Sequence, residues 1–348
     1  MAGSCDRTLR TYPPMIPANR LPAQPVRWQQ LWREAITDPR ELLAVLGLSG
    51  HAGELLPAID TDFALRVPRG FVARMRHGDP ADPLLRQVLP QAAELGDVPG
   101  FTRDAVGDLA ARSANGVLHK YEGRALLVAT GSCAVHCRYC FRRHFPYADE
   151  TAAANRWGEA VEHLRGDASI HEVILSGGDP LSLSTAKLAE LGDALAAIPH
   201  VRRLRIHTRL PIVLPERVDA EFHDWFAALP LQRVVVLHAN HPAEFDAAVD
   251  AACLHLRDAG ATVLNQAVLL RGVNDDADAL AGLSERAFAA GVLPYYLHQL
   301  DRVTGAAHFE VPDGRALALV EALRRRLPGY LVPRLVREIA GEPSKTPL

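Results

Sequence analysis

The stretch that decides the fold runs from Ala125 to Cys140, ALLVATGSCAVHCRYC, where a short apolar run is followed at once by three cysteines. The run Ala125–Thr130 has the length and continuous apolar character of a strand buried on both faces. Similar runs recur downstream about every 30 residues, the length of one βα unit. They are Glu172–Ser176, Arg203–His207, Arg233–His238, Thr262–Leu269 and Val292–Leu297. The sequence therefore predicts six parallel strands in one sheet.

Between these runs lie segments with helical spacing, such as Ser184–Ala197 and Glu244–Asp258, the second closed by Gly260 as a C-cap. Strands that alternate with amphipathic helices are typical of an α/β protein with a parallel sheet. Six units indicate an open or partial (βα)6 barrel rather than a closed barrel of eight. In such a barrel the functional residues follow the carboxyl ends of the strands, which is where the three cysteines fall.

The regions on either side of the predicted barrel have a different pattern. We divide the chain into a helical N-terminal region (1–100), a barrel (101–311) and a C-terminal helix, strand and tail (312–348). Asp38 followed by Pro39 is a typical helix start. Helices are predicted at Trp28–Ile36, Arg40–Leu48, Leu84–Leu95 and Gly314–Leu327, and a further strand at Leu331–Ile339.

The composition is that of a soluble globular protein of 348 residues, 48% hydrophobic and 23% charged, with a net charge of −3. That charge creates no field that attracts nucleic acid or an anionic membrane. No apolar stretch approaches the roughly 20 residues that a membrane helix needs. The first residues, MAGSCDRTLRTYPPMIP, lack the apolar segment of a secretion signal. We therefore expect a cytoplasmic protein without a nucleic-acid or membrane partner.

Five cysteines are present, and three of them, Cys133, Cys137 and Cys140, fall within eight residues. A disulfide framework would need spread pairs and an oxidising compartment, so the cluster favours a metal site. Three thiolates can hold a [4Fe–4S] cluster with one iron open to a further ligand. Zinc, which takes four ligands, is the alternative if His136 or His144 supplies the fourth.

The spacing C-x3-C-x2-C, with an aromatic residue before the last cysteine, resembles the radical S-adenosylmethionine (SAM) superfamily. A second match is Ser176–Pro180, SGGDP, directly after the second predicted strand. There the superfamily carries a motif for the methionine amino group of SAM. The resemblance implies that Gly177 and Gly178 admit the ligand to the backbone and that the Asp179 carboxylate accepts from its ammonium.

A finer resemblance, to the lysine 2,3-aminomutase family, extends from about Trp28 to the end of the chain. It is carried by HKYEGRALLVATGSCAVHCRYCFRRHFPY, LSGGDPLSL, RIHTRLPIVLPERV, NQAVLLRGVND, PYYLHQLD and GEPSKTPL. The family uses a [4Fe–4S] cluster, SAM and pyridoxal 5′-phosphate (PLP), together with an electron donor such as flavodoxin or ferredoxin. These segments look most like the short bacterial subgroup, which makes β-lysine for modification of elongation factor P.

The resemblance assigns roles to individual residues around PLP and the substrate carboxylate. Lys345 matches the lysine that binds PLP covalently. Without the resemblance, it would be interpreted as a solvated lysine near the end of the chain. Tyr121 and Arg124 match residues that contact PLP. Arg142 matches the arginine that holds the carboxylate of the substrate, a bidentate task suited to a guanidinium. Without the family, these arginines would be read as ordinary surface or strand-flanking charges.

Two acids match the pair that binds the ε-ammonium of lysine in the family. Asp301 ends PYYLHQLD, and Glu338 lies seven residues before Lys345, where the clostridial type has Asp. Two acids favour a cationic substrate, so lysine is expected rather than glutamate or another amino acid. Neighbours of SAM are expected among His207, Arg209, His238 and Asn240.

The family's longer members also bind zinc through clustered cysteines in a C-terminal segment, whereas this sequence stops at Leu348. They bind the same zinc through a cysteine after Val-Asn-Asp, and the matching position here is Asp276. We therefore expect no zinc, and the oligomeric state stays open because that zinc helps to join subunits. A non-catalytic zinc or redox module is the alternative from another class of protein, and iron and sulfide content would separate the two.

Overall fold

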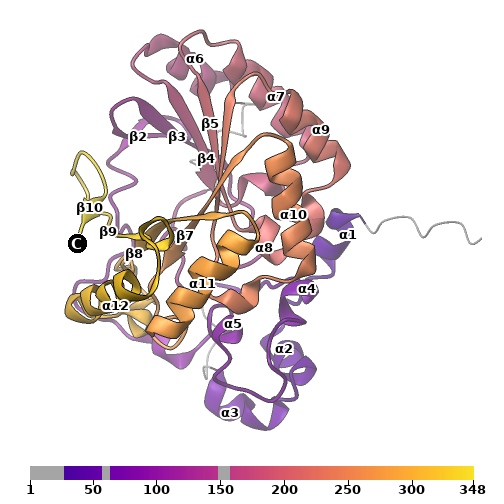
Figure 1. The fold of residues 1–348 in the computed structure, drawn as a ribbon, viewed down its shortest axis with the longest axis vertical. Coiled ribbons are helices and arrows are strands. Elements are labelled where there is room, and N and C mark those ends of the chain that lie inside the picture. The colour runs from indigo at the N-terminus through magenta and orange to yellow at the C-terminus, as the bar shows by residue number, and fades with distance from the viewer. Residues whose placement is uncertain (1–26, 57–62, 148–156) are drawn as a thin grey trace, which may run out of the picture.

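The computed structural model describes residues 27–56, 63–147 and 157–348, so Cys5 lies outside the described ranges. Its strands form one sheet in the order of the sequence (Figure 1). They are β1 (Arg112–Ala114), β2 (Val117–Tyr121), β3 (Arg124–Thr130), β4 (Glu172–Gly177), β5 (Arg203–Thr208), β6 (Gln232–Leu237), β7 (Thr262–Val268), β8 (Leu293–His298), β9 (Arg334–Arg337) and β10 (Thr346–Pro347).

The parallel part of the sheet runs from β3 to β9, and an antiparallel partner flanks it at each side. Among the described strands no ladder joins β1 to β10, so the barrel is open, as the six predicted units indicated. The strand predicted at Leu331–Ile339 is present but shorter. It begins only after Pro333, which has no N–H to give to the ladder.

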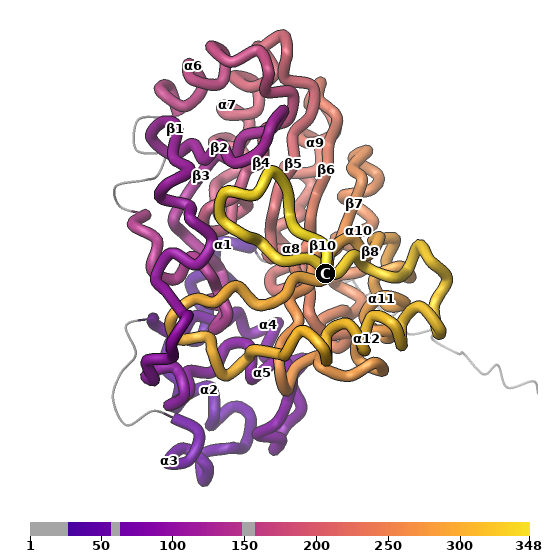
Figure 2. The backbone as a smooth tube through the Cα atoms, turned by 90° about the vertical axis from the view of Figure 1, so that its left-hand side faces the viewer, coloured from indigo at the N-terminus to yellow at the C-terminus, as the bar shows by residue number. Residues whose placement is uncertain are grey.

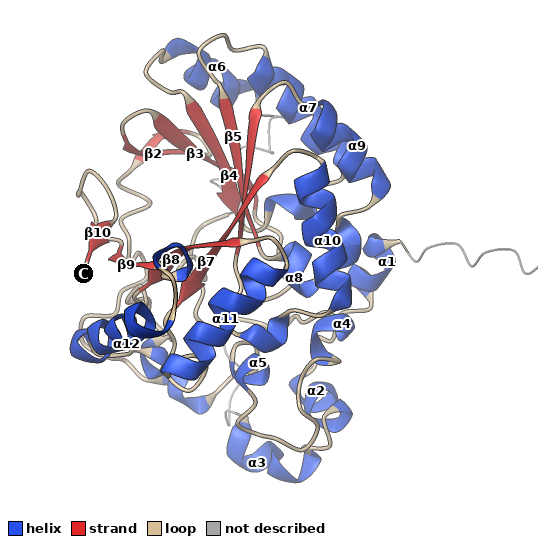
Figure 3. Cartoon of the chain, viewed as in Figure 1, coloured by secondary structure: helices blue, strands red, loops and turns tan. Residues whose placement is uncertain are grey.

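The helices cover the outer side of the curved sheet, as Figure 3 shows. Those of the barrel are α6 (Gly158–Gly166), α7 (Thr185–Ala196), α8 (Leu210–Val213), α9 (Ala220–Ala228), α10 (Ala247–Asp258), α11 (Ala277–Ala289) and α12 (Asp313–Arg326). Gly260 follows α10 with φ +81°, which confirms the predicted C-cap.

The N-terminal region contributes short helices at the end of the barrel where the parallel strands stop (Figure 1). They are α1 (Trp28–Arg33), α2 (Pro39–Val45), α3 (Ala52–Leu55), α4 (Arg69–Val72) and α5 (Pro83–Arg86). Asp38 caps α2 as predicted, accepting from the Arg40 N–H. The single helix predicted at Leu84–Leu95 is wrong: α5 and a 3-10 turn at Ala92–Leu95 flank Pro90, which cannot continue a helix.

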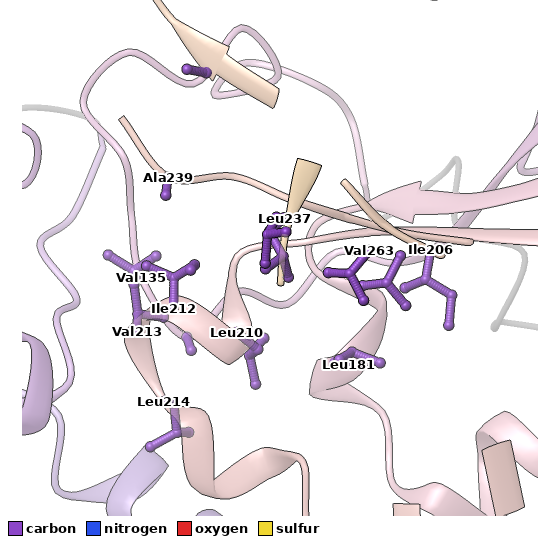
Figure 4. Packing of buried hydrophobic residues seen from close by; sticks show 14 of the residues in the cluster. Val135, Leu181, Ile206, Leu210, Ile212, Val213, Leu214, Leu237, Ala239 and Val263 are labelled. Atoms are coloured by element: carbon purple, nitrogen blue, oxygen red, sulfur yellow. The ribbon is translucent and has the colours of Figure 1, made fainter. Parts of the chain in front are cut away.

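Apolar side chains of the N-terminal region and of the barrel belong to one hydrophobic cluster. Figure 4 shows part of it, with Val135 of the cysteine loop beside Ile212 of α8. Phe71 of α4 is fully buried in the same cluster. Apolar side chains of this cluster therefore pack against the loop that carries the cysteines. No helix in the described ranges is long and apolar enough to cross a membrane.

Candidate active site

The loop Gly131–Phe141 follows β3 and carries the three cysteines at the carboxyl end of the parallel sheet. Burial raises the pKa of the Cys133 thiol above its usual range and that of Cys140 to about 11, and the neighbouring thiols add to both shifts. Cysteine thiols bind a metal as thiolates, so a metal that binds to this loop displaces their protons. This donor set fits an iron–sulfur cluster.

A buried ion-pair network fixes this loop to the N-terminal region. Arg138, between two of the cysteines, is completely buried and donates from Nε to Glu94 Oε1 at 2.8 Å. Arg143 Nη2 lies 2.8 Å from Glu94 Oε2. The Arg138 N–H also donates to the carbonyl of Gln87 at 2.8 Å. One carboxylate thus pairs with two guanidinium groups that border the cysteines.

We expect Glu94→Ala to lower the free energy of unfolding by about 3–5 kcal/mol, because it leaves buried guanidinium charge without its partner. Denaturant titration of the metal-free protein measures this. The matched control is Glu162→Ala, which removes an exposed pair with Arg165 and should cost no more than about 1 kcal/mol. Equal losses in the two variants would contradict a structural role for the buried pair.

The zinc alternative finds little support in the placement of the two histidines. His136 Nδ1 lies 2.8 Å from the Ala64 carbonyl, and its ring stacks on Phe63. His144 Nε2 lies 3.2 Å from the Thr304 carbonyl. Within the described ranges, no three His, Cys, Asp or Glu side chains are placed to hold one metal ion together. In an iron–sulfur cluster each thiolate binds a different iron, so the three sulfur atoms surround the cluster and do not share one metal ion.

Gly177, the last residue of β4, and Gly178, directly after it, allow the ends of β3 and β4 to meet. Gly177 has φ +109°, and a Cβ there would lie 2.7 Å from the Thr130 carbonyl oxygen. At Gly178 a Cβ would lie 2.5 Å from the Ser132 carbonyl oxygen, on the cysteine loop. These glycines are therefore required for backbone packing beside the cysteines, whatever else they contact.

Asp179 differs from the expectation that its carboxylate is open to a ligand. One oxygen accepts from Thr208 Oγ1 at 2.7 Å and from the Leu181 N–H, and the other accepts from the N–H groups of Arg209 and Leu210. Burial raises its pKa to about 6, and the hydrogen bonds oppose that shift. In this structure the carboxylate ties the end of β4 to the end of β5.

Two of the expected SAM neighbours, Arg209 and Asn240, belong to a buried polar network that contacts the cysteine loop. Arg209 Nη1 lies 2.8 Å from Cys137 Sγ and 2.8 Å from the Tyr139 hydroxyl. Asn240 Nδ2 donates to the same hydroxyl at 2.7 Å. Gln87 and Glu244 complete the network through Arg209 Nη2.

The C-terminal tail, which carries the predicted PLP lysine, is the yellow tube at the end of the chain in Figure 2 and contacts Tyr121 of β2 through Glu338. Lys345 Nζ donates to Glu338 Oε2 at 2.6 Å, and the Tyr121 hydroxyl donates to Glu338 Oε1 at 2.6 Å. The Arg124 guanidinium lies 4.6 Å from the centre of the Tyr121 ring. β10 pairs with β9 just beyond Lys345, so the tail is held by backbone hydrogen bonds.

Charge and burial set opposite pKa shifts for the two acids of the predicted ammonium pair. Burial would raise the pKa of Glu338, but Lys345 and the Tyr121 hydroxyl together hold it below its usual value. Burial raises the pKa of Asp301 to about 7, Lys345 opposes that shift, and Glu338 adds to it. Lys345 thus influences both acids, which places the three groups in one electrostatic environment.

Several buried polar atoms at the ends of the parallel strands have no hydrogen-bond partner among the described residues. They are His207 Nε2, His238 Nε2, Gln266 Oε1, His298 Nε2 and Asp301 Oδ1. Buried polar atoms are almost always paired, so such a set indicates a polar occupant. The charge of Lys345 lowers the pKa of all three histidines further, after burial. The set therefore fits a polar cofactor held between the strand ends and Lys345.

Arg142 is buried on the cysteine side of the opening. Its Nε lies 2.6 Å from Asp108 Oδ2, and its Nη1 donates to Ser176 Oγ at 3.0 Å. The other terminal nitrogen has no hydrogen-bond partner among the described residues. Two of the three guanidinium nitrogens are thus held by the protein, and the third is left to bind an anion.

Sequence reasoning missed the residues that hold this site from outside the motifs. Glu94, Gln87 and Asp108 come from segments before β1, and Glu244 comes from the turn after β6. Lys120, adjacent to Tyr121, contacts Asp108 at 2.7 Å and Glu338 at 3.6 Å. Only Lys120 lies within a quoted motif. For the others no local pattern distinguishes them from surface charges.

Comparison with known proteins identifies relatives over nearly the whole chain. The family model described as the radical SAM superfamily matches residues 127–283. The L-lysine 2,3-aminomutase of Escherichia coli K12 is 49% identical over 325 residues, covering 92% of this chain and 94% of that protein. The enzyme of the same name from Haemophilus influenzae is 45% identical over 331 residues, covering 94% and 98%. That from Clostridium subterminale is 33% identical over 325 residues, covering 92% and 77%.

Proposed function

Because the chain belongs to the L-lysine 2,3-aminomutase family of radical SAM enzymes, we propose that it moves the amino group of L-lysine from C2 to C3 with PLP as a cofactor. As a member of this family, the protein is an isomerase that uses a [4Fe–4S] cluster and SAM. An electron donor reduces the cluster. We further propose that it acts in the cytoplasm, with flavodoxin or ferredoxin as the donor. Its product, β-lysine, would serve the modification of elongation factor P.

The observation that supports this proposal is the presence in the site of two acids beside Lys345 and of a guanidinium, that of Arg142, with an unpaired terminal nitrogen. Asp301 and Glu338 both feel the charge of Lys345, and the guanidinium of Arg142 has one terminal nitrogen without a hydrogen-bond partner among the described residues. An α-amino acid with a cationic side chain has complementary charges at its two ends. Glutamate would bring an anion to the two acids, so the arrangement favours lysine.

Each residue has a definite task in the proposed reaction. When bound, the cluster and SAM supply the radical that removes hydrogen from an unactivated carbon, and PLP carries the migrating nitrogen. Arg142 would hold the substrate carboxylate, and Asp301 and Glu338 would hold its ε-ammonium, which together fix C2 and C3 relative to the cofactors. Cys133, Cys137 and Cys140 would hold the cluster, and Lys345 would hold PLP.

Other residues would support the cofactors. Tyr121 and Arg124 are proposed to contact PLP beside Lys345, and the backbone of Gly177 and Gly178 is proposed to approach SAM. The burial of the strand ends would keep water from the reacting carbon.

The direct test is anaerobic incubation of the reconstituted enzyme with L-lysine, SAM, PLP and a reductant, followed by chiral amino-acid analysis. Parallel incubation with L-glutamate tests the substrate class. We expect β-lysine and no β-glutamate, and β-glutamate alone would contradict the assignment of the two acids. The cellular role is tested by intact-mass analysis of elongation factor P after deletion of the gene. Rescue by added β-lysine is expected, and failure of that rescue would contradict the role.

We expect lysine binding to weaken as the pH falls below about 7, because protonation removes the charge of Asp301. The ionised form is the one that binds an ammonium, so the proton competes with the substrate. Asp301→Asn should weaken binding by about 2–5 kcal/mol, the cost of losing one partner of a buried charge pair, and should flatten this pH dependence.

Lysine titration monitored by PLP absorbance between pH 6 and pH 8 measures both effects. Asp278→Asn, which changes an exposed acid on α11, is the control and should retain the parental slope. A parental slope in Asp301→Asn would show that another group titrates.

A further inference from the structure

Asp108 is a buried acid that none of the motifs includes, yet it contacts two cations of the site. It is 2% exposed and lies between the N-terminal region and β1. Oδ2 lies 2.6 Å from Arg142 Nε, and Oδ1 lies 2.7 Å from Lys120 Nζ. Burial alone would raise its pKa, but these two cations hold it below the usual value. The carboxylate is therefore charged and fixed from two sides.

The backbone around Asp108 is fixed by a local hydrogen bond and by packing against the tail. Its N–H donates to Asp104 Oδ1 at 2.9 Å. The preceding residue, Gly107, has φ +66°, and a Cβ there would lie 2.9 Å from the Cβ of Ala340. The segment thus packs closely against the tail that carries Glu338 and Lys345. A carboxylate held so firmly can define the orientation of a flexible arginine.

The contact with Asp108 determines which nitrogen atoms of the Arg142 guanidinium stay available to bind a ligand. A guanidinium is planar, so contacts at Nε and Nη1 fix the plane and leave the second terminal nitrogen for another acceptor. Ser176 Oγ, 3.0 Å from Nη1, is a neutral partner and contributes no charge. Asp108 is the only acid that the structure places in contact with Arg142 among the described residues.

We propose that Asp108 is a positioning residue for substrate binding, which holds the Arg142 guanidinium in the orientation that accepts the α-carboxylate. Lys120 fixes the second oxygen of Asp108 and so completes the support. This inference rests on the proposed function, in which Arg142 binds the substrate carboxylate. It predicts that Asp108 contributes to the recognition of one end of the substrate and not of the other.

The test compares two ligands of the PLP-loaded enzyme: L-lysine, and 1,5-diaminopentane, which keeps both amino groups and lacks the carboxylate. Their dissociation constants are read from the change in PLP absorbance. The ratio of the two constants measures recognition of the carboxylate. Effects on folding, on PLP loading or on the ammonium end act on both ligands and cancel in the ratio. We expect this selectivity to fall by about tenfold or more in Asp108→Asn, since the amide cannot serve as an anionic partner of Arg142.

Two further variants make the result decisive. Arg142→Gln should abolish the selectivity, and if it does not, the proposed role of Arg142 itself fails. If Arg142→Gln abolishes the selectivity while Asp108→Asn keeps the parental ratio, the inference is wrong and the proposed function stands. Asp108→Glu keeps the charge and should recover part of the selectivity. Should Asp108→Asn not load PLP, Asp108→Glu is compared with the parent instead, and an unchanged ratio there would overturn the proposal.

Discussion

Replacement of Cys137 by alanine should abolish the iron–sulfur cluster and with it all cleavage of SAM. The parental enzyme, reconstituted anaerobically, should bind about four iron atoms and a matching amount of acid-labile sulfide. The cluster needs all three thiolates of the loop, and the variant would supply two. Arg209 lies 2.8 Å from the Cys137 sulfur, but a guanidinium is only a hydrogen-bond donor and cannot replace the thiolate as an iron ligand. Alanine is preferred to serine because a hydroxyl could itself serve as a ligand. Cys133→Ala and Cys140→Ala should behave alike.

The matched control is Cys253→Ala, which removes a buried thiol from α10, remote from the cysteine loop. It should keep full iron content and full SAM cleavage. Analysis of iron, sulfide and zinc in all variants also separates the proposed enzyme from a zinc module. A Cys137→Ala protein with parental iron content would overturn the assignment of the cluster ligands.

Replacement of Lys345 by alanine should remove the covalent attachment of PLP while leaving the cluster and SAM binding intact. The lysine lies on the tail, and the cluster ligands lie on the loop after β3, so the two sites can be lost independently. Borohydride reduction followed by peptide mapping should find the pyridoxyl group on Lys345 in the parent and on no peptide in the variant. Turnover of lysine should fall to background.

Lys120 is the competitor that this experiment must exclude. Its Nζ lies 3.6 Å from Glu338, the same acid that Lys345 contacts at 2.6 Å. A pyridoxyl group on Lys120 in the parental protein, with Lys345 unmodified, would overturn the assignment. Lys187→Ala, which removes an exposed lysine near the start of α7, serves as the control and should keep the adduct.

Much of the fold could be predicted because its strands are continuous apolar runs with a regular spacing. All six predicted barrel strands are present within a residue or so of their expected bounds. The hairpin β1–β2 was missed, although Asn115-Gly116 between the two strands is a strong turn signal, because the flanking segments are short and mixed in polarity. β10 has only two residues, one of them proline, and forms because β9 offers a free edge. No sequence pattern of that length specifies a strand.

The candidate site likewise contains residues whose roles could be predicted from the sequence and residues whose roles could not. The cysteines, the two glycines and Lys345 lie in compact motifs, so spacing and resemblance could assign them roles. Asp108 and Glu94 act on Arg142 and Arg138 across 34 and 44 residues, and only the completed fold makes those contacts. Asp179 shows a different relation between motif and structure. Its position in the motif suggested a ligand contact, and its carboxylate is occupied by hydrogen bonds within the protein.

The polar network beneath the cysteine loop bears on the order of events during biosynthesis. Gln87 contacts Asn240 and Glu244, which follow it by 153 and 157 residues. The thiols therefore emerge during translation long before the strands that complete their surroundings, and contacts of such separation form late in folding. Until then the loop lacks Arg209 and its partners and exposes three thiols to oxidants and adventitious metals. Insertion of the cluster is thus expected to be a late maturation step, carried out on a barrel that has already formed.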